Sequence, residues 1–191
     1  MIKLTLQDSE VQRLKRLLGT NRYDFLGCTL DLEQITLTDN LLDASEDSAP
    51  TELQVMVFST LLAHYASAKP IPLTGNLVKY RDVPGGYAYE GAFIKRAVQP
   101  IAKAFGDNPE DLPRAAELLG GARCKLGDAS AQVIALAGIP LTYILWVAED
   151  LPASANVLYD SSASNYLPTE DLAVLGELTT LRLIDAKRII V

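Results

Sequence analysis

Residues 129–148 read ASAQVIALAGIPLTYILWVA and form an uncharged run between Asp128 and Glu149. The run is long enough to suggest a membrane segment, but it contains Ser130, Gln132 and Gly138 and lacks basic residues on both flanks. Its most apolar parts, 131–137 and 141–147, have the length of β-strands. The run therefore predicts two buried strands, and we expect no association with a membrane.

Segments on both sides of this run add further strands. Strand-like stretches at 122–125 and 156–159 flank it. Apolar residues alternate with polar ones between Tyr23 and Leu37, which predicts two short strands in a hairpin. An acidic loop is expected from Asp39 to Pro50.

Helical patterns occupy much of the remaining sequence. The run after Asp8-Ser9, closed by Gly19 as C-cap, predicts an amphipathic helix whose basic residues face outward: Arg13, Lys15 and Arg16. The stretch from Pro50 to about Ala66 is apolar on so broad a surface that we expect a central, largely buried helix. Further helices are predicted at 88–105, at 108–120 and from Pro168 onward.

These elements predict an α+β fold in a single domain over residues 1–191. We expect a mainly antiparallel or mixed sheet, with the buried central helix and flanking helices around it. The sequence of 191 residues is 49% hydrophobic and 21% charged, which excludes a disordered chain. Its 17 basic and 24 acidic residues give a net charge of −7, which disfavours nucleic acid as a partner. The N-terminus lacks the pattern of a secretory signal, so a cytoplasmic location is expected.

His64 is the only histidine, so any Ser-His-Asp or Cys-His enzyme would have to use it as the base. Two interpretations stay open: a hydrogen-bonded core histidine, or a ligand or proton-transfer group. Cys28 and Cys124 stand too far from each other and from His64 to match a zinc motif, and they predict reduced, buried thiols. No metal site is predicted, and the sequence indicates no particular cofactor.

The loop at 72–86, PLTGNLVKYRDVPGG, is the best candidate for a binding site. It lies in the basic middle of the chain, 69–125, between two acidic stretches. Its glycines allow close approach to a ligand, and a guanidinium can hold a carboxylate or phosphate. The alternative is a structural turn. The candidate ligand-binding residues are Tyr80, Arg81, Asp82, Gly85 and Gly86.

A second candidate loop begins at Asp160, directly after a predicted strand. Asp160 could act as a general base, and Ser161 and Tyr166 could contribute to binding. Glu170 and Asp171 fall where a helix N-terminus favours negative charge, so helix stabilisation already accounts for them.

The sequence resembles an uncharacterised family of bacteria and archaea, domain of unknown function 3786. The resemblance rests on residues 61–65 (LLAHY), 72–75 (PLTG), 80–86 (YRDVPGG), 126–129 (LGDA), 157–160 (VLYD) and 166–172 (YLPTEDL). Members come mostly from anaerobes, and some carry a four-cysteine iron–sulfur module beside this domain. The present chain has no such module, so the resemblance implies that any cluster belongs to a partner protein.

Three functional hypotheses follow. The first is a non-catalytic cytoplasmic module that binds a small anionic ligand, a cofactor or a partner in anaerobic redox or one-carbon metabolism, linked to iron–sulfur proteins or corrinoids. The second is an enzyme in which His64 or Asp160 is the general base and Arg81 stabilises negative charge, which requires their loops to meet in one pocket. The third is a structural oligomer subunit.

Overall fold

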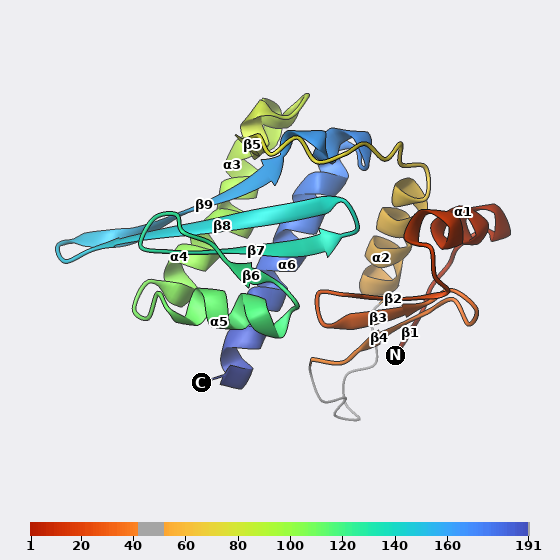
Figure 1. Cartoon of the computed structure of the whole chain (residues 1–191), viewed down its shortest axis with the longest axis horizontal. Coiled ribbons are helices and arrows are strands. Elements are labelled where there is room, and N and C mark those ends of the chain that lie inside the picture. The colour runs from red at the N-terminus through yellow and green to blue at the C-terminus, as the bar shows by residue number, and fades with distance from the viewer. Residues whose placement is uncertain (42–51, 191) are drawn as a thin grey trace.

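The computed structural model describes residues 1–41 and 52–190 (Figure 1). Its larger sheet has the strand order β5-β9-β8-β7-β6 and is antiparallel throughout. The uncharged run forms the two strands predicted for it, β7 (Ala129–Leu136) and β8 (Ile139–Ala148). The others are β5 (Leu77–Lys79), β6 (Ala122–Arg123) and β9 (Leu151–Asp160).

Helices cover one face of the larger sheet. Residues 90–105 form one continuous helical segment, made of α3 (Glu90–Phe93), a π-helical stretch (Ile94–Val98) and α4 (Gln99–Phe105). α5 (Asp111–Leu118) and α6 (Thr169–Ile190) pack beside it. The alternate side chains of β7 and β8 that face these helices are fully buried: Ala131, Val133, Leu141, Tyr143 and Leu145.

The smaller sheet lies at the N-terminal end of the chain and has the order β1-β4-β3-β2. Its strands are β1 (Ile2–Lys3), β2 (Arg22–Phe25), β3 (Cys28–Asp31) and β4 (Thr36–Asp39). The region predicted as a two-stranded hairpin thus holds three strands, because Leu26 and Gly27 adopt positive φ angles of 50° and 72° and reverse the chain early. The predicted first helix is confirmed as α1 (Asp8–Leu18), with Gly19 in the left-handed conformation as its C-cap.

The helix predicted from Pro50 to Ala66 forms as α2 (Glu52–Tyr65), although Pro50 and most of the acidic loop lie outside the described residues. The expectation that this helix is central and largely buried is wrong. Leu53 and Met56 are 62% and 58% exposed, because α2 packs only its C-terminal half into the core. The central helix is α6, which contacts α3, α4, α5 and β7.

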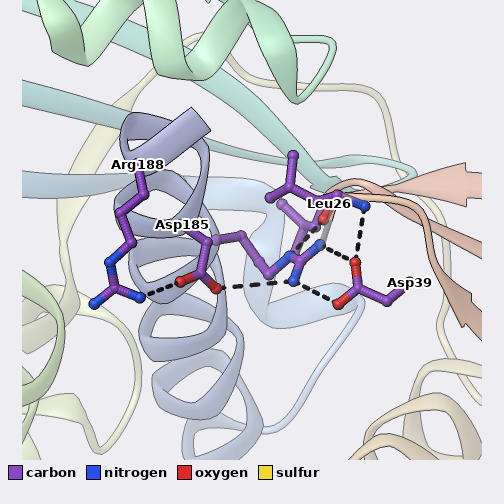
Figure 2. Close-up of polar contacts among 6 residues, drawn as sticks. Leu26, Asp39, Asp185 and Arg188 are labelled. Atoms are coloured by element: carbon purple, nitrogen blue, oxygen red, sulfur yellow. Dashed lines mark hydrogen bonds and ion pairs between the residues drawn. The ribbon is translucent and has the colours of Figure 1, made fainter. Parts of the chain in front are cut away.

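One arginine of α6, drawn without a label between Asp185 and Asp39 in Figure 2, links this helix to the smaller sheet. Arg182 forms a two-pronged ion pair with Asp39 of β4, at 2.8 and 2.7 Å, and its Nε donates to the Leu26 carbonyl at 2.9 Å. Its side chain is only 12% exposed. A buried guanidinium needs such partners, so the contact fixes the register of α6 against the smaller sheet.

A single cluster of buried apolar side chains extends from the smaller sheet through α2 to the larger sheet and its helices. The α+β class is confirmed, and both sheets are antiparallel rather than mixed. Among the described residues, no helix combines the length and apolar character needed to span a membrane.

Candidate functional site

Asp160 ends β9 and is almost completely buried. Its carboxylate accepts hydrogen bonds from the amides of Thr74, Gly75 and Ser162 at 3.1, 2.7 and 2.9 Å, and from the Thr74 hydroxyl at 2.9 Å. Burial alone would raise its pKa, but the hydrogen bonds from Ser162 and Thr74 outweigh burial and lower the pKa far below its ordinary value. A carboxylate held in this way is a weak base, and its geometry favours a structural role.

The aromatic residues of both predicted loops also tie backbone segments together. The Tyr80 hydroxyl donates to the Thr169 carbonyl at 3.1 Å, and the Tyr166 hydroxyl donates to the Ile71 carbonyl at 2.8 Å. Both rings are buried. Gly86 lacks room for a side chain, because a Cβ there would lie 1.9 Å from the Tyr80 carbonyl oxygen. These three residues hold the loops in place and leave few groups free for a ligand.

Arg81 lies at a small hollow of about 200 Å³ between the 79–98 segment and β9. Its guanidinium is 3.4 Å from the Glu90 carboxylate and stacks over the Tyr87 ring. Lys79 and Asn156 also line this hollow, whereas Asp82, Gly85 and Ser161 do not. Because Glu90 offsets the charge of Arg81, this hollow is only modestly suited to an anion.

His64 lies near the C-terminal end of α2 and is half-exposed, with 51% of its side chain accessible. The interpretation of His64 as a buried core histidine is therefore wrong. Its Nδ1 is 2.5 Å from Oδ2 of Asp171, in the first turn of α6. When Nδ1 carries the proton, it donates to Asp171 and leaves Nε2 as the basic nitrogen. Asp171 therefore orients the ring across two helices that are far apart in the sequence.

His64 lines a groove of about 800 Å³ along α2, a larger space than the hollow at Arg81. The segment 5–10 forms the opposite wall, with Gln7 and Glu10 at the start of α1. On the α2 side, the acidic Glu52 lines the groove together with apolar and hydroxyl side chains: Val55, Met56, Ser59, Thr60 and Ala63. The groove suits a molecule with an apolar body and a few polar groups.

A basic hollow of about 440 Å³ adjoins this groove, and Ser67 lines both. Arg13 and Arg16 of α1 form one side of it, and residues 66–68 after α2 form the other. Within the described ranges neither arginine forms an ion pair, although Arg16 Nε donates to the Gln12 carbonyl at 3.3 Å. We call the groove and the basic hollow together the α1–α2 seam.

The structure thus separates the residues that the sequence patterns grouped. His64 lines the α1–α2 seam, Arg81 lines a different hollow, and Asp160 lines neither. Sequence reasoning placed Arg13 and Arg16 on an outward helix face but gave them no role. It assigned Asp171 to the helix N-terminus alone, since no local signal indicates a partner 107 residues away.

No group of three or more metal-binding side chains occurs among residues 1–41 and 52–190. Cys28 is buried, and burial raises the pKa of its thiol to about 11. Cys124 is partly exposed, and burial raises its pKa as well. Both thiols are free, and both remain protonated at neutral pH.

The molecule is an α+β domain in which a half-exposed histidine, paired with Asp171, lines a groove along α2. Residues 32–182 match the family described as Domain of unknown function (DUF3786), so the chain belongs to this family. Searches of curated proteins and of solved structures find no match. The matched range includes His64 and Asp171, whereas the helix that carries Arg13 and Arg16 precedes it.

Proposed function

We propose that this protein is a non-catalytic binding module for a small anionic ligand and that the α1–α2 seam is its site. The ligand's anionic group would lie against Arg13 and Arg16, and its apolar part in the groove beside His64. The observation that carries the proposal is the shared wall at Ser67, which places two cations without acidic partners among the described residues next to a groove that is partly apolar and has Glu10 and Glu52 in its lining.

The chemistry of the two hollows supports this assignment. A guanidinium binds phosphate or carboxylate through two parallel hydrogen bonds, and two of them on one helix face raise the local positive potential. The apolar side chains of Met56 and Val55 provide area that a ligand can bury. The Arg81 hollow is smaller, and Glu90 competes there with any anion.

The resemblance to DUF3786 adds one prediction to this proposal, and the N-terminal sequence adds another. One is a place in anaerobic redox or one-carbon metabolism, with an iron–sulfur protein or a corrinoid nearby. The other is a cytoplasmic location.

Two probes test the proposed site: inorganic phosphate and phenyl phosphate. In amide-detected NMR, we expect phosphate to shift the amides of Ala66, Ser67 and Ala68, and phenyl phosphate to bind more tightly and also to shift amides along α2. The double variant Arg13→Gln/Arg16→Gln should lose both effects. The matched control Lys95→Gln/Arg96→Gln, on another helical segment, should keep them. Shifts confined to the amides around Arg81 would overturn the proposed site.

A second candidate function is general-base catalysis at His64, because the contact with Asp171 holds the ring as in hydrolytic enzymes. Nε2 would take a proton from the water that attacks the carbonyl carbon of an ester placed in the groove. The acyl–oxygen bond would then break, and the protonated imidazole would return the proton to the leaving alkoxide. Asp160 drops out of this candidate, since its carboxylate already accepts four hydrogen bonds. We expect any hydrolysis of p-nitrophenyl esters to disappear in His64→Gln and to fall in Asp171→Asn. A wild-type protein without turnover would leave binding as the function.

A further inference from the structure

The β8–β9 hairpin extends beyond the rest of the larger sheet as a two-stranded arm (Figure 1). β7 begins at Ala129, opposite Leu145, so β8 has no strand on its outer edge from Trp146 onward. We call residues 146–152 the arm. Every residue of the arm is exposed, including Trp146, which is 38% accessible, and Leu151, which is 71% accessible.

Several large apolar side chains are exposed on the arm and at its base. Trp146, Val147 and Leu151 lie on it, and Leu126 is exposed in the turn at its base. The Trp146 indole borders that turn, since a Cβ at Gly127 would lie 3.2 Å from its Nε1. Grouped apolar residues on a protruding element mark an interaction site more often than scattered ones do.

The surface carries acidic side chains at one end and a lysine at the other. The tip of the arm carries Glu149 and Asp150, whereas Lys125 lies in the basal turn and forms no ion pair within the described ranges. Asp128 lies in the same turn, and its carboxylate is bonded to the Val147 amide. The turn is level with Leu145, whose carbonyl accepts a hydrogen bond from the Asp128 amide at 2.9 Å. The tip lies four residues farther along β8, or about 13 Å at the usual rise of a strand.

The arm and basal turn of one copy are complementary to those of a second copy. A two-fold axis near Val147 would place the acidic tip of one arm on Lys125 of another copy, and the reverse contact would form by symmetry. The apolar side chains would meet between these charges. Pairing through the backbone is hindered, because the Asp128 carboxylate already accepts the Val147 amide at 2.7 Å. The contact would therefore use side chains.

We propose that the arm and the Lys125–Asp128 turn form a docking surface for a second copy of this chain, in an antiparallel two-fold dimer. The proposal is independent of the α1–α2 seam, because no residue of the arm lines either of its hollows.

Trp146 is the only tryptophan, so its fluorescence reports on the arm directly. We expect sedimentation velocity of the full chain to show a dimer at tens of micromolar, and the emission maximum to shift to shorter wavelength as the dimer forms. Trp146→Ala should remove the dimer. Leu181→Ser changes an exposed leucine of α6 and serves as the matched control that keeps it. A single-chain mass and an unchanged emission maximum over the whole concentration range would overturn the proposal.

Charge reversal tests the geometry of the contact. Lys125→Glu, and separately Glu149→Lys/Asp150→Lys, should each weaken the dimer by about tenfold, since each places like charges opposite one another. The three substitutions combined restore opposite signs and should restore dimerisation. All these positions are exposed, so folding is expected to persist and is checked by circular dichroism. A dimer that forms equally well in Lys125→Glu and in Glu149→Lys/Asp150→Lys would show that another surface mediates it.

Discussion

The loops around Asp160 and the α1–α2 seam use polar residues in opposite ways. Around Asp160, the carboxylate and the hydroxyls of Tyr80 and Tyr166 each hold a backbone segment. In the seam, the exposed side chains of Arg13 and Arg16 and the half-exposed side chain of His64 line hollows. A buried polar group without a hydrogen-bond partner destabilises the fold, whereas an exposed polar group remains available to bind a ligand. The loops whose sequence looks most like a binding site are therefore the ones whose polar groups stabilise the fold.

The largest expected effect comes from the Asp160 carboxylate. Asp160→Ala would leave four donors without their acceptor and should lower the free energy of unfolding by about 4 kcal/mol. Urea denaturation followed by circular dichroism measures this loss. The control Asp31→Ala removes a carboxylate that accepts two backbone amides on an exposed turn, and its loss should be clearly smaller. Equal losses would contradict the structural role of Asp160.

The same carboxylate predicts a pH dependence. Because the pKa of Asp160 is lower in the folded state than in the unfolded chain, its contribution is complete above the unfolded pKa of about 4 and is lost as the pH falls toward the folded pKa. The difference in unfolding free energy between wild type and Asp160→Asn should be constant from pH 7 to 5 and shrink below about pH 4. A difference that grows toward acid pH would contradict this sign.

The contact between α6 and the smaller sheet gives the next effect. Arg182→Ala removes a two-pronged ion pair and the hydrogen bond to Leu26, and should lower the free energy of unfolding by about 2–3 kcal/mol. Arg188→Ala is the matched control on the same helix. Arg188 is 73% exposed and pairs only with Asp185 in the described structure, so its loss should stay below about 0.5 kcal/mol.

Thiol labelling measures how readily the smaller sheet opens near this contact. Iodoacetamide at pH 8 should modify Cys124 first, because Cys28 is buried and its pKa is about 11. Labelling of Cys28 requires the smaller sheet to open, so Arg182→Ala should accelerate it while leaving the rate at Cys124 unchanged. Mass spectrometry of digested samples measures both rates. Equal labelling of the two thiols in wild type would contradict the buried position of Cys28.

The smallest effect on stability is expected in the seam. Arg13→Gln/Arg16→Gln should change the free energy of unfolding by less than about 0.5 kcal/mol, because both side chains are exposed and form no ion pair among the described residues. The same variant should lose the stabilisation that phenyl phosphate gives the wild type in a thermal-shift measurement. A large loss of stability without ligand would assign these arginines to folding and remove the contrast with Asp160.

Much of the fold was predictable from local patterns. The uncharged run gave β7 and β8, and the apolar spacing with Gly19 predicted α1. The prediction for α2 was right in type and wrong in burial, because an apolar helix surface does not tell how much of it the rest of the chain covers. The third strand of the smaller sheet depended on positive φ angles at Leu26 and Gly27, and Leu26 carries no signal for one.

The candidate site was predictable only in part. His64 was singled out because it is the only histidine, and it does line the groove along α2. Arg81 and Asp160 were singled out for their loop context, but their contacts with Glu90, Thr74 and Gly75 depend on packing between distant segments. No sequence signal assigns Arg13 and Arg16 to a binding site, since outward basic residues on a helix are common.

The sequence by itself determined the elements, because apolar period, glycine and proline act over a few neighbouring residues. It also determined the class of the fold and the membership in DUF3786. Only the tertiary structure decided which polar groups are bonded and which are free. That decision depends on contacts such as His64 with Asp171 and Arg182 with Asp39, whose partners lie 107 and 143 residues apart and meet only when the helices and sheets pack together.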